Sequence, residues 1–311
     1  MTEPSAPPPH GDAPPTAATL RWIVGCLGPG SRVRQIRPLP GGVSHVNHAL
    51  LVETRSGIVH RLVLRRWARP GPTIADLEFP PEREIAALAL LARCEVTTPA
   101  LVAADPSGAY CDAPALLITR LVGHPPRPGP DDLPEHLIQL AAALLSIHAV
   151  SGATTMPPYA PHNQLHVRVP PRHALRPALW AQAFEVGAGP APADGESRFI
   201  HRDYHPGNTL WSYGRLSGVV DWSTASYGPP AVDVADMRWQ LAVRYGTEIA
   251  DGFLTAVHQV CGDHEHDPYW DVRAVLDLLP EHGDWTISEP HIPLLEDHLA
   301  RALSRLGSVA R

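Results

Sequence analysis

The sequence of 311 residues contains no lysine, so all 25 of its basic side chains are arginine. This absence excludes a Schiff-base lysine and a phosphate-binding lysine; a side-chain cation bound to phosphate would here be arginine. The four cysteines show no CxxC spacing, which excludes a typical cysteine zinc site or disulfide framework. No apolar run reaches the roughly 18 residues that a membrane-spanning helix needs.

Charge gives a second set of exclusions. The formal net charge is −7, which argues against a general nucleic-acid surface. The acid excess is concentrated from Glu248 onward, where twelve carboxylates face four arginines. This excess favours a cationic partner, although a solvated acidic surface is the simpler interpretation.

The chain divides into a tail and two compositionally different parts. Residues 1–18 are rich in proline and alanine and lack the features of a signal peptide, so we expect a disordered tail and a cytoplasmic protein. Residues 19–122 contain predicted strands around one main helix at 82–94. Residues 123–311 are largely helical, with helices predicted at 133–149, 230–244, 248–261, 269–279 and 291–306. These patterns predict an α+β fold of two lobes, a strand-rich N-lobe and a larger helical C-lobe.

One segment, residues 199–221, contains the residues suited to chemistry. It reads FIHRDYHPGNTLWSYGRLSGVVD. Pro206-Gly207 favours a turn, and two short strands with a tight turn at Gly214 follow it. Such a hairpin would return Asp221 towards Asn208, and would bring both close to Asp203.

Oxygen ligands and a nearby carboxylate suit phosphoryl transfer. Asn208 and Asp221 offer the oxygen atoms that Mg²⁺ prefers. Asp203, five residues before Asn208, is placed to accept a hydrogen bond from an attacking hydroxyl. Positioning, charge neutralisation and such a base are the main requirements of this reaction.

Three motifs give a specific resemblance. HRDYHPGN at 201–208, VVDW at 219–222 and GPPAVD at 228–233 resemble, in order and spacing, the aminoglycoside phosphotransferase and choline-kinase-like family. That family has the protein-kinase-like fold. The resemblance implies that Asp203 is the catalytic base, that Asn208 and Asp221 are magnesium ligands, and that His201 and Asp233 support the loop.

The same resemblance extends to the N-terminal half. Gly41, Gly42 and Ser44 resemble the loop that covers the nucleotide phosphates, where glycines let backbone N–H groups approach phosphate oxygens. The backbone from Thr119 to Leu121 resembles the connection that binds the adenine edge. Side chains there do not distinguish ATP from GTP.

Arg65 lies where the family has its phosphate-binding cation. An arginine fork can bind phosphate in bidentate fashion. Strand register leaves Arg66 as the alternative, because successive side chains point to opposite faces. The acidic partner of the cation would be Glu84, with Glu82 as its alternative.

The resemblance therefore implies a kinase that moves the γ-phosphate of ATP or GTP to a hydroxyl of an aminoglycoside-like or other small molecule. We expect the acceptor near residues 248–289, where Trp270 and Trp285 could stack on a ring. We expect Asp236 to be a solvent-exposed carboxylate on its helix. Two alternatives stay open. One is a non-catalytic nucleotide-binding protein of the same fold, and the other is a metal-dependent hydrolase that uses His201, Asp203 and His205.

Overall fold

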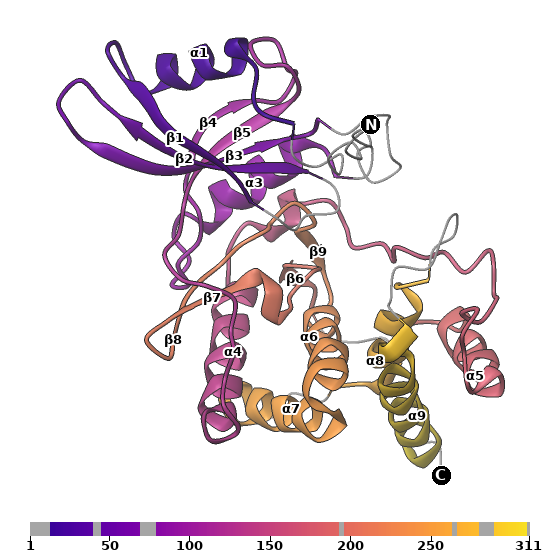
Figure 1. The fold of residues 1–311 in the computed structure, drawn as a ribbon. Helices are drawn as coiled ribbons and strands as arrows, with labels where there is room; N and C mark the ends of the chain where they lie inside the picture. Colours follow the sequence, from indigo (N-terminus) through magenta and orange to yellow (C-terminus); the bar gives the residue numbers. More distant parts are fainter. Residues whose placement is uncertain are drawn as a thin grey trace, which may run out of the picture. The chain divides into compact units, whose positions relative to one another are not determined.

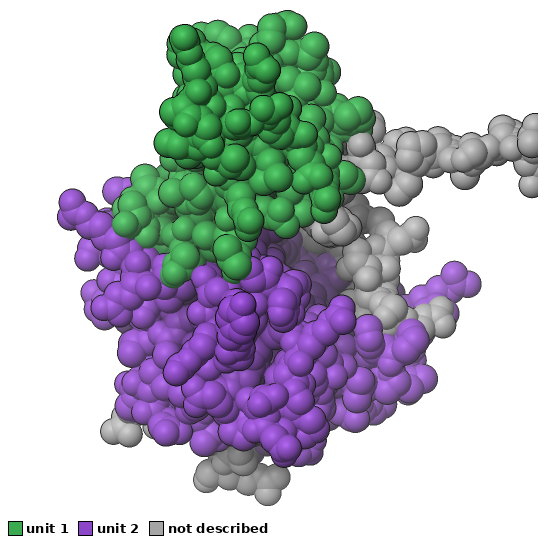
Figure 2. Space-filling view, turned by 60° about the vertical axis from the view of Figure 1, so that its left-hand side comes forward, with its two compact units in different colours: residues 1–92, 97–122, 222–224 green, residues 93–96, 123–221, 225–311 purple. Residues whose placement is uncertain are grey.

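The computed structural model describes six stretches of the chain, residues 13–39, 45–68, 79–192, 196–262, 266–279 and 289–309. They form two compact units, coloured green and purple in Figure 2. Unit 1 contains residues 1–92, 97–122 and 222–224, and unit 2 contains residues 93–96, 123–221 and 225–311. Each unit has its own core.

Unit 1 is built on one antiparallel sheet (Figure 1). Its strand order is β1-β2-β3-β5-β4. The strands are β1 (Arg32–Leu39), β2 (Val46–Glu53), β3 (Val59–Arg66), β4 (Leu101–Asp105) and β5 (Ala115–Thr119). The turn between β2 and β3 contains Gly57 with φ of +84°, a conformation that costs glycine nothing.

Two helices lie on opposite faces of this sheet (Figure 1). Helix α1 (Ala17–Cys26) packs its buried Ile23 against Leu62 and Leu64 of β3. Because side chains alternate along a strand, Arg65 points to the other face. Helix α3 (Pro81–Leu91) lies there and begins with a proline, whose fixed φ suits a first helical turn.

Unit 2 is mainly helical. Its helices are α4 (Leu133–His148), α5 (Pro177–Ala188), α6 (Ala231–Tyr245), α7 (Thr247–Cys261), α8 (Pro268–Leu276) and α9 (Ile292–Val309). Helices α5, α8 and α9 share an apolar core that includes Trp180, Val275 and Leu299, all fully buried. No helix in the described stretches is both long and apolar enough to cross a membrane.

Four short strands interrupt the helices of unit 2. Strand β6 (Arg198–Ile200) pairs with β9 (Ser226–Gly228), and β7 (Thr209–Ser212) forms a hairpin with β8 (Arg215–Val219). A one-turn 3₁₀ helix, Pro206–Asn208, separates β6 from β7. These strands hold both ends of the loop at 201–208.

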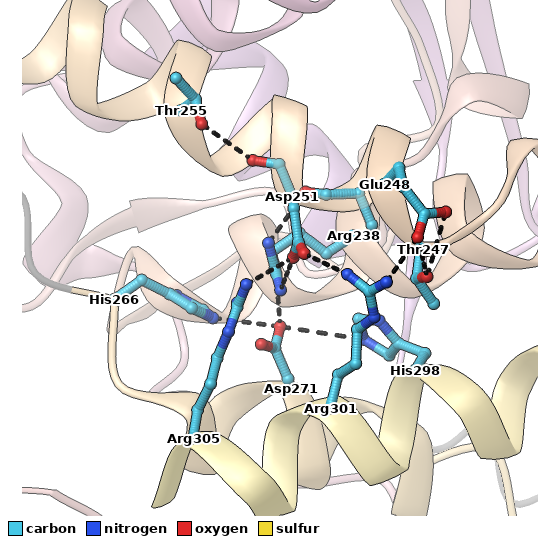
Figure 3. Close-up of polar contacts among 11 residues, drawn as sticks. Arg238, Thr247, Glu248, Asp251, Thr255, His266, Asp271, His298, Arg301 and Arg305 are labelled. Atoms are coloured by element: carbon cyan, nitrogen blue, oxygen red, sulfur yellow. Dashed lines mark hydrogen bonds and ion pairs between the residues drawn. The ribbon is translucent and has the colours of Figure 1, made fainter. Parts of the chain in front are cut away.

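A buried ion network ties helices α6 to α9 of unit 2 together (Figure 3). Arg238 on α6 donates to Asp271 on α8 at 2.8 Å and to the carbonyl of Ala250 on α7 at 2.8 Å. Nε2 of His266 and of His298 lies 3.1 and 3.9 Å from the same Asp271 oxygen. Burial alone would raise the pKa of Asp271, but Arg238 and the two histidines hold it well below its ordinary value.

The predicted α+β class is confirmed, with a strand-rich first part and a larger helical part. Helix α1 begins at Ala17, within the stretch expected as a tail, and Thr16 caps it by accepting a hydrogen bond from the amide of Thr19. Strand β1 and helix α5 were not predicted from the sequence.

Candidate active site

One buried carboxylate fastens the loop after β6 to helix α6. Asp233, fully buried in the first turn of α6, accepts hydrogen bonds from the backbone amides of His201 (2.9 Å) and Arg202 (2.7 Å). His148 Nε2 lies 2.9 Å from the same carboxylate. Arg202 has a φ of +64°, a left-handed conformation that costs a non-glycine residue about 1–3 kcal/mol. Asp233 stabilises this conformation immediately before Asp203.

Asp203 is the accessible carboxylate of this loop. Its side chain is 47% exposed. Asn208 Nδ2 donates to the backbone carbonyl of Asp203 at 3.0 Å and to its Oδ2 at 2.9 Å. The second carboxylate oxygen lies 3.5 Å from His205 Nε2. The carboxylate is therefore held in place while solvent, or a ligand, can still reach it.

The β7–β8 hairpin brings Asp221 next to Asn208. Thr209 pairs with Val219, and the amide of Val220 donates to the carbonyl of Asn208 at 2.9 Å. The carbonyl of Val220 lies 3.0 Å from His201 Nε2. Asp221 follows with a φ of +69°. The predicted convergence of Asp203, Asn208 and Asp221 at one end of the hairpin is thus present in the backbone.

The chemistry of this donor set fits a hard cation. Asn208 uses its Nδ2 for Asp203, and its Oδ1 accepts no hydrogen bond from the described residues. Together with the Asp221 carboxylate it offers oxygen atoms of the kind that Mg²⁺ binds, usually with water and substrate phosphates as the other ligands. Asn208 and Asp221 are therefore the candidate metal ligands.

The alternative metal triad of His201, Asp203 and His205 is not assembled. His201 is fully buried, and its Nε2 is engaged with the carbonyl of Val220. His205 Nδ1 accepts a hydrogen bond from the amide of Gly207 at 3.0 Å. Among the described stretches of the chain, no three His, Cys, Asp or Glu side chains are grouped so that they could hold a metal ion. Because both imidazoles have other partners, the structure does not support a metal-dependent hydrolase that uses these three residues.

In unit 1, Arg65 and Glu84 form a buried ion pair. Arg65 Nη1 lies 3.0 Å from Glu84 Oε2, and the two residues are 6% and 1% exposed. The pair joins β3 to α3. Glu82, the alternative acidic partner, is exposed in the same first turn.

Arg66 points to the opposite face of the sheet. Its Nη1 lies 2.5 Å from Asp112 Oδ2, and its Nη2 donates to the carbonyl of Ala13. These contacts fasten the segment before α1 to the sheet. Arg65 therefore has the partner expected of the cation, whereas Arg66 has a different structural task.

Only some of the remaining candidates for the nucleotide site lie in the described stretches of the chain. Thr119 ends β5, and its Oγ1 accepts a hydrogen bond from the amide of Ala100 at 2.8 Å. The backbone groups of Leu121 form no hydrogen bond with the described residues, so they are available to a ligand. Gly41, Gly42 and Ser44 lie outside the described residues, and the phosphate-covering loop stays a prediction.

A cavity of about 90 Å³ opens beside Asp203 within unit 2. Its walls come from the loop at 201–205 and from helices α6 and α8. Trp270, one of the two tryptophans expected near an acceptor, lines it, whereas Trp285 lies outside the described residues.

Asp236 corrects one expectation, since it is not a solvated helix carboxylate. It is partly buried and lines the cavity. The sequence does indicate that Asp236 lies on the same face of its helix as Asp233, because residues three places apart are neighbours on a helix. The sequence could not show that this face borders a cavity and not open solvent.

This fold and loop architecture agree with the resemblance that the motifs gave. A family model, the phosphotransferase enzyme family, matches residues 35–276, so the chain belongs to that family. The family resemblance drawn from the motifs is confirmed. No curated protein matches the chain.

Solved structures of similar fold include several antibiotic phosphotransferases. A thermostable mutant of aminoglycoside phosphotransferase APH(4)-Ia, in ternary complex with AMP-PNP and hygromycin B, has a TM-score of 0.63 and 16% identity, covering 93% of this chain and 98% of that one. Macrolide 2'-phosphotransferase type I has a TM-score of 0.57 and 18% identity, covering 94% and 97%. Macrolide 2'-phosphotransferase MphH from Brachybacterium faecium has a TM-score of 0.50 and 20% identity, covering 88% and 87%. At these identities the fold is what is shared.

Proposed function

We propose that this protein is a magnesium-dependent kinase that transfers the γ-phosphate of ATP or GTP to a hydroxyl group of a small molecule. The observation that carries the proposal is the Asp203 carboxylate, held by Asn208, anchored through the Asp233-bound loop, and open to a cavity. The family match and the AMP-PNP complex of a protein with similar fold support the use of a nucleotide.

Asp203 would act as the general base. The acceptor hydroxyl donates its hydrogen bond to Asp203, and its proton passes to the carboxylate as the new O–P bond forms. The bond between the γ-phosphorus and the bridging oxygen breaks, and the nucleoside diphosphate leaves with that electron pair. General-base assistance of this kind contributes about 10²- to 10⁴-fold in rate.

Asn208 and Asp221 would hold the metal. A bound Mg²⁺ would neutralise phosphate charge during transfer. Asn208 donates from its Nδ2 to Asp203, which leaves its Oδ1 for the metal ion. The same side chain would thus position the base and bind the metal.

Arg65 would bind a phosphate oxygen of the nucleotide. Its ion pair with Glu84 restrains the guanidinium, and a guanidinium has a geometry suited to phosphate oxygens. The backbone of Leu121 would bind the adenine or guanine edge, since its N–H and C=O have no partner among the described residues.

The decisive experiment is a nucleotide-consumption screen with Mg-ATP and Mg-GTP against aminoglycosides, macrolides, amino sugars and amino alcohols. We expect acceptor-dependent release of nucleoside diphosphate and a phosphorylated acceptor by mass spectrometry, both lost in Asp203→Ala. Magnesium-dependent nucleotide binding without turnover of any acceptor would instead favour the non-catalytic alternative.

A further inference from the structure

Helix α6 carries a second carboxylate, one turn after Asp233. Asp236 lines the cavity that opens beside Asp203, and no described residue donates a hydrogen bond to it or forms an ion pair with it. Burial raises its pKa well above the ordinary value, and the carboxylates of Asp203, Asp233 and Asp277 raise it further. Arg202 offsets only part of this effect. The positive charge near Asp236 is therefore too small to balance the charge of its ionised carboxylate.

The two other carboxylates of the cavity wall have hydrogen-bond donors. Asp277 accepts a hydrogen bond from Arg273 Nη2 at 2.7 Å and from the amide of Asn163 at 3.2 Å. Asp203 accepts from Asn208. Asp236 is the carboxylate lining this cavity that no described donor satisfies. A buried carboxylate without a partner is costly to ionise, so a cationic ligand group would bind there with the largest gain.

Arg273 also lines the cavity, but its guanidinium is engaged elsewhere. Its Nη2 donates to the backbone carbonyl of Asn163 and to Asp277 Oδ1, and no hydrogen bond joins it to Asp236. The side chains of Tyr159, Trp239 and Trp270 add aromatic walls, which tolerate both an apolar ring and a cation.

The size of the cavity limits the group it can enclose. At about 90 Å³ it has room for roughly six to nine water-sized groups. That matches a short amino alcohol, or the part of an amino-sugar ring that carries the amino group.

We infer that Asp236 is the acceptor-recognition carboxylate, which binds an ammonium group of a compact amino alcohol or amino-sugar ring whose hydroxyl reaches Asp203. This inference rests on the proposed function for the fate of the hydroxyl, but the binding of the ammonium group does not depend on catalysis. Asp236 determines specificity, while Asp203 serves the reaction.

The test compares amines with their neutral counterparts. Amino alcohols and amino sugars are each paired with the N-acetyl analogue, and binding is measured by calorimetry alongside kcat and KM. The protein is compared with Asp236→Asn and with Glu185→Gln, a matched loss of one negative charge on α5 at a side chain that is 82% exposed. Affinity for Mg-nucleotide is the control for folding.

We expect the protein to bind at least one amine about ten- to hundredfold more tightly than its N-acetyl analogue, the range for one charge-assisted hydrogen bond. Asp236→Asn should remove this preference through KM, while Glu185→Gln and nucleotide affinity stay unchanged. Amine binding that depends on Asp236 without phosphoryl transfer would support the inference and contradict the proposed function. Transfer to amine and N-acetyl acceptors alike, an unchanged preference in Asp236→Asn, or binding of no amine would overturn the inference.

Discussion

Asn208 donates two hydrogen bonds to Asp203, one to its backbone carbonyl at 3.0 Å and one to its Oδ2 at 2.9 Å. The side chain thereby closes the loop between the two residues and fixes the carboxylate. The amide nitrogen is used for Asp203, and the amide oxygen is left for a metal ion. The candidate base and a candidate metal ligand are therefore in direct contact.

Asp203→Ala should lower phosphoryl transfer by about 10²- to 10⁴-fold, because the acceptor hydroxyl loses its base. The affinity for Mg-nucleotide should remain close to that of the unchanged protein, since Asp203 is not among the proposed ligands. Steady-state kinetics and nucleotide titration check the two parts separately. Unchanged turnover would refute the role of Asp203.

Asp221→Ala should abolish the magnesium dependence of nucleotide binding, because one of the two proposed oxygen ligands is removed. Nucleotide titrations with Mg²⁺ and with EDTA provide the measurement. In EDTA the variant and the unchanged protein should agree, which controls for a folding defect. Full retention of the magnesium effect would exclude Asp221 as a ligand.

Substitutions of the two neighbouring arginines of β3 should have different effects on nucleotide binding and on stability. Arg65→Met should weaken nucleotide binding by roughly tenfold or more, as expected for a charge-assisted hydrogen bond to phosphate. Arg66→Met should lower the free energy of unfolding, because the contacts with Asp112 and with the carbonyl of Ala13 are lost. It should have little specific effect on nucleotide binding.

Nucleotide titration and urea unfolding of both variants distinguish these outcomes. Because Arg65→Met also leaves Glu84 without its partner, Glu84→Gln is the control for that loss. If Arg66→Met alone weakened nucleotide binding, the assignment of Arg65 would be wrong.

Arg238→Met should destabilise unit 2 by about 3–5 kcal/mol, because it leaves the fully buried Asp271 without its main partner. Arg301 offers a matched control: its side chain is 44% exposed and pairs with Glu248 and Asp251. Arg301→Met should cost about 0–1 kcal/mol, as surface ion pairs do. Urea unfolding measures both, and equal effects would contradict this account of the network.

Stability should fall as the pH is lowered from 6.5 towards 4. Burial lowers the pKa of His298 to about 4, below the 6.5 of an exposed histidine. In this window the unfolded chain binds a proton that the folded chain does not, so acid favours unfolding.

The contribution of His298 is fully present above pH 6.5 and amounts to about 3 kcal/mol at 1.36 kcal/mol per pKa unit. Unfolding midpoints in urea at pH 7 and pH 5 check the effect, and His298→Gln should reduce the difference. Identical midpoints for the unchanged protein at both values would count against it.

The sequence could predict those elements whose signal is local. The helices near 82–94, 133–149 and 230–244 carry periodic apolar residues, and proline starts several of them. Strand β1 was missed because, at the sheet edge, its side chains show no clear alternation of burial. Helix α5 was not predicted, and its packing depends on a distant segment: Gly187 lies so close to the Leu276 side chain that a Cβ would clash with it.

The sequence by itself determined the order and spacing of the loop at 201–208 and of Asp221, since a turn and a hairpin follow from neighbouring residues. Tertiary structure decided that Asp233 binds the loop amides, that Arg65 and not Arg66 meets Glu84, and that Asp236 borders a cavity. These relationships join segments far apart in the chain. Their partners are set by how helices and strands pack, which local spacing does not specify.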